Sequence, residues 1–138
     1  MATEESAAHD DYKAAVVALP GTETARTSMF GPEMPEFNPM RVLRNRIVRQ
    51  WENRVAEIPA DTSGEPVIGQ MDLLGRHLEL HRFSNLVPMR GATVGDVEEM
   101  ALPAGQGVGL VQAVEPAASV IARMTADAVA MLGKYGRG

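Results

Sequence analysis

Apolar residues recur at helical spacing in three parts of the chain, and this pattern predicts three helices. The first covers residues 5–19. The second covers residues 39–58, with Asn38 as its N-cap. The third covers residues 115–132 and is expected to end at Gly133, a residue type that suits a C-terminal cap. The apolar stripes of the two longer helices are Leu43, Ile47, Trp51, Val55 and Ile58 in the second, and Val120, Ile121, Met124, Ala128, Met131 and Leu132 in the third.

Strand patterns are shorter than the helical ones. Residues 22–30, which follow a Pro20-Gly21 stop, alternate weakly and predict one strand. Leu78 and Leu80 alternate with polar neighbours, so residues 67–83 predict further short strands. The predicted fold class is therefore mainly α with minor β, in one region of residues 1–138. The other segments are predicted as loops at 31–39, 60–66 and 84–95, a helical turn at 96–102 and a frayed end at 134–138.

Composition narrows the classes of function. The 138 residues fit one domain, and 45% hydrophobic with 22% charged residues is typical of a globular protein. A net charge of −5 does not favour a nucleic acid partner. The absence of cysteine rules out disulfides and thiolate metal sites and is compatible with a cytoplasmic location. No apolar run reaches 18 residues and the first residues are acidic, so neither a membrane span nor a secretory leader is expected.

One glycine-rich segment, Gly105-Gln106-Gly107-Val108-Gly109, is the main candidate site. Bare backbone amides of such loops can approach an anion closely. The spacing is neither that of a dinucleotide-binding fingerprint nor that of a Walker A loop. Two interpretations stay open: a site for a phosphate group, or a tight connection in which the glycines supply positive φ angles.

Three other groups of polar residues have simpler interpretations than a functional site. Five arginines on the second helix, interleaved with glutamates, favour a solvated or packing face over a nucleic acid site. His77 and His81 are four residues apart but have no third convergent ligand, so no metal site is assigned. Glu98 and Glu99 are adjacent, and adjacent helical residues do not face each other, so they do not predict an acid/base pair. The arginines are Arg41, Arg44, Arg46, Arg49 and Arg54.

Several short motifs occur in one order along the chain. They are Arg41-Val42-Leu43-Arg44-Asn45, the segment 82–88, Asp96-Val97-Glu98-Glu99-Met100, and Ala104-Gly105-Gln106 followed by Gly109-Leu110. In this order they resemble the C-terminal region of nitronate monooxygenases, also called 2-nitropropane dioxygenases. The resemblance begins near the N-terminus, where residues 2–13 look like the end of the eighth barrel strand and its helix.

The resemblance implies a fold, a cofactor and a reaction. The family is built on a TIM barrel, binds FMN and oxidises alkyl nitronates with dioxygen to a carbonyl compound and nitrite. This chain would supply the end of strand 8, helix 8 and the C-terminal cap helices of an incomplete barrel. The resemblance places Gly105 and Gln106 near the flavin or the substrate, gives Asn45 the role of holding a loop, and makes His9 a surface residue.

The chain is much shorter than the complete fold. A (β/α)₈ barrel needs about 250 residues, and the family's flavin-phosphate glycines and active-site histidine have no counterpart here. No catalytic residue is therefore assigned. Activity would require the missing barrel half from another polypeptide, or a homo-oligomer. We expect the apolar stripes of residues 40–58 and 115–132 to be exposed and to make the chain self-associate.

Two alternatives belong to other functional classes. The chain can be a non-catalytic protein-interaction domain or companion subunit that retains the cap helices. It can also be an anion-binding module centred on residues 105–109.

Overall fold

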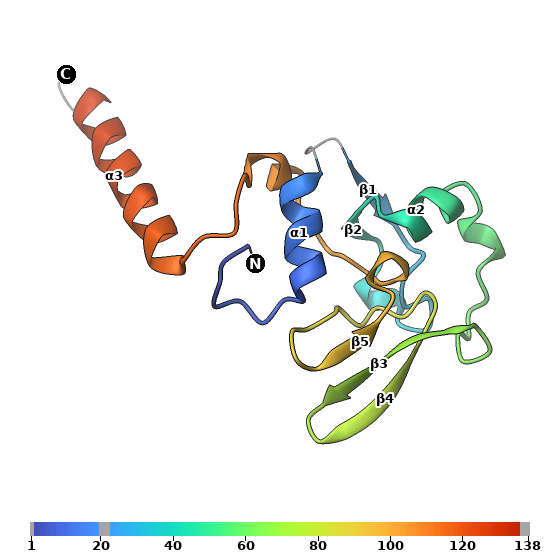
Figure 1. Ribbon diagram of the computed structural model, residues 1–138. Helices are drawn as coiled ribbons and strands as arrows, with labels where there is room; N and C mark the ends of the chain where they lie inside the picture. Colours follow the sequence, from blue (N-terminus) through green and yellow to red (C-terminus); the bar gives the residue numbers. More distant parts are fainter. Residues whose placement is uncertain (1, 20–22, 136–138) are drawn as a thin grey trace.

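The computed structural model describes residues 2–19 and 23–135. Within these residues, three helices and five strands form the framework, joined by short 3-10 turns (Figure 1). In chain order these elements are α1 (Asp10–Ala18), β1 (Thr24–Thr27), η1 (Pro35–Phe37), β2 (Met40–Leu43), α2 (Arg46–Trp51), η2 (Val55–Glu57), β3 (Val67–Leu73), β4 (Arg76–His81), β5 (Thr93–Gly95), η3 (Val97–Glu99), η4 (Gln106–Leu110) and α3 (Ala117–Tyr135).

The strands form two small antiparallel sheets. One contains β1 and β2, and the other has the order β4-β3-β5. The hairpin between β3 and β4 turns at Leu74 and Gly75, whose φ angles of 51° and 76° suit a two-residue hairpin turn. The described residues thus form a small mixed α/β domain, and their strands do not close into a barrel.

Two apolar clusters hold the domain together. The first packs α1 against β3 and β4, and the second lies around β2 and α2. β2 belongs to both, because Leu43 lies in the first cluster and Val42 in the second. The buried residues of the first are Tyr12, Val16, Leu43, Met71, Leu80, Val97, Met100, Leu102 and Val108; those of the second are Met29, Phe30, Val42, Ile47, Val48, Phe83 and Ala101.

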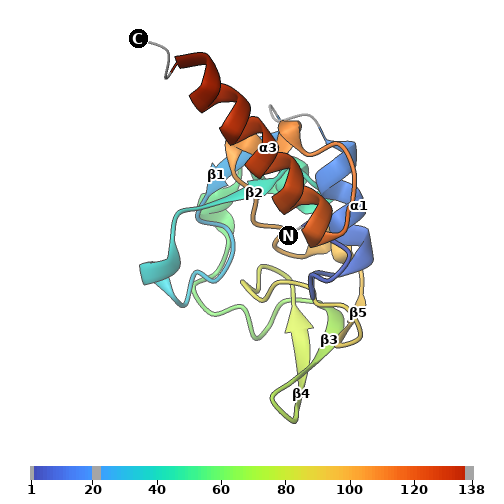
Figure 2. The same cartoon turned by 90° about the vertical axis from the view of Figure 1, so that its left-hand side faces the viewer.

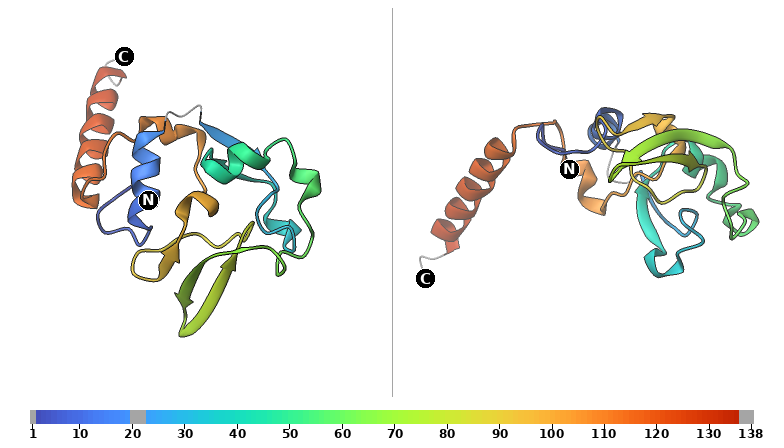
Figure 3. Two further views of the ribbon diagram at one scale, coloured as in Figure 1. Left: turned by 45° about the vertical axis from the view of Figure 1, so that its right-hand side comes forward. Right: turned by 90° about the horizontal axis from the view of Figure 1, so that it is seen from below.

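α3 stands apart from the rest of the domain. It projects away from the body in Figure 1 and in the right-hand view of Figure 3, and it lies in front of the body in Figure 2. None of its residues is buried. The N-terminal segment holds its first turn: the amide of Ala117 donates to both carboxylate oxygens of Glu5, at 3.2 and 2.9 Å. α3 is therefore fixed at one end only.

The predicted helix of residues 39–58 is wrong. Its first part is strand β2, which pairs with β1 from Thr24↔Leu43 to Thr27↔Met40. Helix α2 begins only at Arg46, because the side chain of Asn45, and not that of Asn38, accepts the hydrogen bond of an N-cap. The stripe is also not exposed as expected, since Ile47 is fully buried in the chain's own core.

Other expectations agree better with the structure. The strands of residues 67–83 and the turn of 96–102 are confirmed as β3, β4 and η3. β5 was missed inside a predicted loop, and α3 continues through Gly133 to Tyr135 instead of ending there. α1 begins only at Asp10, after the side chain of His9 has capped it. Two predicted features lie outside the described residues. They are the Pro20-Gly21 stop, with Thr22 after it, and residues 136–138 of the predicted frayed end.

None of the helices in residues 2–19 and 23–135 is long and apolar enough to cross a membrane.

Candidate functional site

The glycine-rich loop leaves the core at a well-anchored point. The amide of Ala104 donates to the carbonyl oxygen of Arg41 in β2 at 3.0 Å. The hydroxyl of Tyr12, from α1, donates to the carbonyl oxygen of Pro103. Two elements far apart in the sequence thus fix the backbone directly before Gly105.

The loop itself faces solvent. Gly105 and Gln106 are exposed, and Gln106 is the first residue of η4. Val108 is buried in the first apolar cluster and anchors the turn from inside. Leu110, by contrast, is 85% exposed. The loop therefore exposes the amide side chain of Gln106, which can both donate and accept hydrogen bonds, and the apolar side chain of Leu110.

The glycines of this loop are not required by the chain's own conformation. Gly105 has a φ of −76°, and a Cβ atom added at Gly105 or Gly107 would meet nothing within 4 Å. The interpretation that these glycines supply positive φ is therefore wrong for this loop. The same open space surrounds Gly64 and Gly133, so it leaves room for a close approach to the backbone without indicating a ligand. The described glycines with positive φ lie elsewhere, at Gly31, Gly75, Gly91 and Gly95.

The loop does not enclose a ligand by itself. A cavity of about 740 Å³ lies between β1 and the α2–η2 segment, and another of about 530 Å³ lies beside the first turns of α3. Neither Gly105 nor Gln106 lines these two cavities. In the described residues the loop is therefore an open surface with exposed backbone and the amide side chain of Gln106, and its assignment to a flavin or substrate site stays a prediction.

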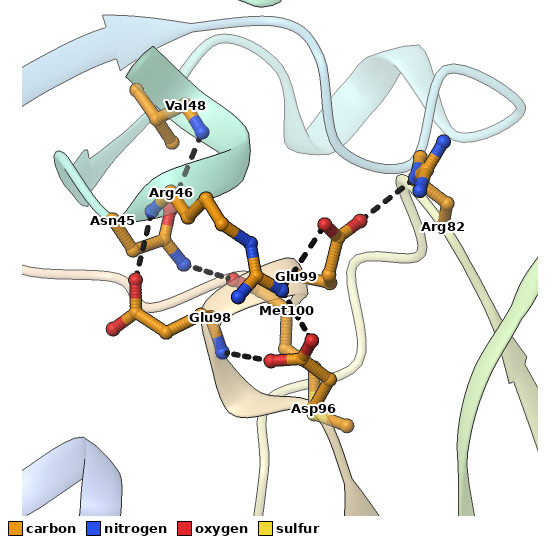
Figure 4. Close-up of polar contacts among 8 residues, drawn as sticks. All are labelled: Asn45, Arg46, Val48, Arg82, Asp96, Glu98, Glu99 and Met100. Atoms are coloured by element: carbon orange, nitrogen blue, oxygen red, sulfur yellow. Dashed lines mark hydrogen bonds and ion pairs between the residues drawn. The ribbon is translucent and has the colours of Figure 1, made fainter. Parts of the chain in front are cut away.

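Asn45 connects α2 to the segment before the glycine-rich loop (Figure 4). Its Oδ1 accepts a hydrogen bond from the amide of Val48 at 3.4 Å, which caps α2. Its Nδ2 donates to the carbonyl oxygen of Met100 at 2.9 Å. Asn45 is 4% exposed, so both bonds lie in the core. The expectation that Asn45 holds a loop is confirmed.

Ion pairs continue this connection at the surface. Arg46 contacts Asp96 and, at 3.3 Å, Glu99, and Glu99 also accepts from Arg82 Nε at 2.8 Å (Figure 4). The hydrogen bond to Asp96 raises the pKa of the Arg46 guanidinium. Glu98 accepts from the backbone amide of Arg46 at 2.8 Å. Glu98 and Glu99 are thus each engaged with arginine, and their contacts are structural.

The histidines have separate local partners. His77 lies 2.8 Å from Asp72 Oδ1, across the β3–β4 hairpin. His81 Nδ1 lies 2.7 Å from the carbonyl oxygen of Glu65. His9 is half-buried, and its Nδ1 accepts from the amide of Asp11 at 3.2 Å as the cap of α1. No group of three or more metal-ligating side chains occurs within residues 2–19 and 23–135.

The arginines of the segment 41–54 have partners on the chain itself. Arg44 pairs with Glu52 at 3.3 Å, and Arg54 pairs with Glu57 at 2.6 Å while its guanidinium lies 4.3 Å from the Trp51 ring centroid. Arg41 donates to Thr24 and Arg49 pairs with Glu23. These contacts agree with a packing and solvated face. Arg41 with Thr24 and Arg49 with Glu23 join residues far apart in sequence, which no local signal could have identified, whereas Arg54 and Glu57 form a local i,i+3 pair.

The chain is similar to two solved structures of FabK from Thermotoga maritima. The structure of FabK itself matches with a TM-score of 0.55 and 20% sequence identity, over 97% of this chain and 37% of FabK. A point mutant of FabK matches with a TM-score of 0.51 and 20% identity, over 97% of this chain and 33% of that chain. No protein-family model and no curated protein matches this chain.

The likeness to FabK therefore concerns the fold. This chain spans about a third of the length of the FabK chains that it matches. Nearly all of this chain takes part in the match, so its overall fold is similar to one part of a larger structure.

Proposed function

We propose that this chain is the C-terminal portion of an FMN-dependent oxidoreductase of the nitronate monooxygenase type. Two observations of different kinds support the proposal: the ordered short motifs, which resemble that family, and the fold, which is similar to about a third of FabK. The activity would be oxidation of alkyl nitronates with dioxygen. The missing barrel half, with the flavin-phosphate loops and the active-site histidine, would come from another polypeptide or from a longer form of this one.

The observation that carries the proposal is the fold match to FabK over 97% of this chain. Within the matched fold, the exposed glycine-rich loop is where we place the contact with the flavin or the substrate. No neighbouring atom lies within 4 Å of the Cβ position at Gly105 or Gly107, although Ala104 and Val108 on either side are fixed by the core. An exposed backbone, anchored on either side and next to the amide of Gln106, suits one wall of a flavin or substrate site. FMN would contact this chain at Gly105 and Gln106, and its phosphate would be bound by the missing half.

A chimera tests the proposal. This chain replaces the matched third of FabK, and FabK truncated at the same junctions is the control. The folded chimera should carry flavin, seen as the visible absorbance of oxidised FMN, and should release nitrite from an alkyl nitronate, whereas the truncated control should do neither. A monomeric, folded chimera without flavin would contradict the proposal. A flavin-loaded chimera that releases no nitrite would contradict the assigned substrate class.

The second candidate function is a non-catalytic interaction domain or companion subunit. One observation favours it: α3 extends from the body with no buried residue. In that case the purified chain would bind a partner protein, and the resulting complex would show no visible absorbance of FMN. The anion-binding alternative has less support, because η4 has only five residues, none of them cationic.

A further inference from the structure

α3 carries a continuous apolar seam that the described chain does not bury. We call Ala117, Ile121, Met124, Ala128, Met131 and Tyr135 the α3 seam; its members follow one another in alternating steps of four and three residues. This is the a/d spacing of a coiled coil. The large members are 61–74% exposed, and no residue of α3 is buried. Such a seam is expected to pack against another helix.

The charges beside the seam discriminate between partner orientations. Asp127 and Lys134 each precede a seam residue by one position, so both lie on the same flank, at g positions of the heptad. In an antiparallel pair of identical helices, g positions face g positions. With Ala128 opposite Met131 of a second copy, Asp127 lies opposite Lys134 of that copy, and symmetry forms this pair twice. A parallel pair would place Leu132 opposite Asp127 instead.

We propose that α3 docks antiparallel against α3 of a second copy of this chain, with Asp127 and Lys134 forming two reciprocal ion pairs. Because symmetric self-complementary interfaces are the commonest form of oligomer, one surface is sufficient to build the contact. The inference goes beyond the proposed function and does not depend on it.

The attachment of α3 to the body is compatible with this contact. Glu5 caps the first turn at Ala117, and Arg123 pairs with Glu115 at 2.8 Å. Both contacts act at the N-terminal part of α3, and the rest of the helix extends clear of the body (Figure 3). A second helix can therefore approach the seam over the segment 124–135 without displacing the domain.

The register is also determined by charge. A shift by one heptad would increase the overlap by placing Ile121 opposite Met131 of the second copy. That shift would bring Asp127 opposite its own equivalent, and like charges at facing positions are destabilising. The register with Ala128 opposite Met131 avoids this repulsion.

The first experiment compares two exposed positions of the full chain by sedimentation equilibrium over a concentration series. Met131→Ser removes a seam residue, and Val129→Ser removes a residue of similar exposure on the opposite face (61% and 65%). Wild type and Val129→Ser should dimerise with similar dissociation constants, whereas Met131→Ser should be weaker by about tenfold or more. A monomeric wild-type chain, or equal effects of both variants, would overturn the proposal.

Charge reversal tests the orientation. Asp127→Lys places like charges opposite each other in both reciprocal pairs, as does Lys134→Asp. Each single variant should raise the dimer dissociation constant by about tenfold, because two attractive pairs become repulsive. The double variant Asp127→Lys/Lys134→Asp should restore the wild-type value. Single variants without effect, or a double variant no better than the singles, would exclude this arrangement.

Spin labels give a readout that does not depend on affinity. The chain has no cysteine, so Ser119→Cys introduces a single labelling site. In the proposed register the two labelled positions lie about 30 Å apart along the helix axis, against about 20 Å for the register shifted by one heptad. A parallel pair would bring the labels side by side. A measured separation that matches a parallel pair would contradict the proposal.

Discussion

The hydroxyl of Tyr12 donates to the carbonyl oxygen of Pro103, a residue 91 positions further along the chain. The ring of Tyr12 is 1% exposed, and burial raises the pKa of its hydroxyl. The bond joins α1 to the backbone directly before Gly105. The candidate site therefore depends on a contact between the two ends of the domain.

Tyr12→Phe should destabilise the domain by about 1–3 kcal/mol, because the part-buried carbonyl of Pro103 loses its donor. The measurement is the free energy of unfolding in urea. Tyr135→Phe is the matched control in dilute, monomeric protein, since Tyr135 is 74% exposed on α3 of the single chain and should there change stability by less than about 0.5 kcal/mol. Equal stabilities of the two variants would show that the Tyr12 bond contributes nothing.

Asn45→Ala should destabilise by about 2–4 kcal/mol, because it removes the cap of α2 and leaves the carbonyl of Met100 without its donor. Asn53→Ala is the control, because Asn53 is exposed. Chemical denaturation of both variants measures the difference. If Asn45→Ala unfolds at the same urea concentration as Asn53→Ala, the two hydrogen bonds do not hold this junction.

In the second apolar cluster, alanine substitutions at Phe83 and Trp51 should destabilise the domain to different extents. Phe83 is fully buried, whereas Trp51 is only partly buried and meets Phe83 edge to face at 5.0 Å. Phe83→Ala should cost about 3–5 kcal/mol and Trp51→Ala less, about 2–3 kcal/mol. Thermal or chemical unfolding gives both values. A larger loss of stability for Trp51→Ala than for Phe83→Ala would contradict this order and show that Trp51 contributes more to the cluster.

The contact between Glu5 and the first turn of α3 should depend on pH. The hydrogen bond from the amide of Ala117 lowers the pKa of the Glu5 carboxyl. A lowered pKa means that the contact is present at neutral pH and is lost as the pH falls through that value. The amide proton signal of Ala117 should therefore titrate with a midpoint below that of a glutamate in an unstructured peptide. Glu5→Gln should abolish this step; a midpoint at or above the peptide value would contradict the contact.

The sequence identified α3 and the β3–β4 strands because each pattern is local and periodic. It failed at residues 39–58, where Leu43, Ile47 and Trp51 also fit a helical stripe. The strand β2 forms there because β1 on one side and residues 102–104 on the other supply backbone partners, and a sequence window cannot contain them.

The assignment of Gly105 and Gln106 to a site stays a prediction. The sequence singled out the glycine-rich loop, but the exposure and the φ angles of this loop could not be read from it. The contacts that position it were missed entirely. Tyr12 and Pro103, and likewise Arg46 and Glu99, are brought together only by the fold.

Turnover of the FabK chimera with and without Gln106→Leu tests the central claim most directly. Gln106 is exposed, so the substitution should leave the unfolding temperature unchanged. If Gly105 and Gln106 face the flavin or the substrate, nitrite release should fall by about tenfold or more, because an amide that donates and accepts is replaced by an apolar group. Unchanged kinetics with bound flavin would contradict the claim and leave this loop a structural connector.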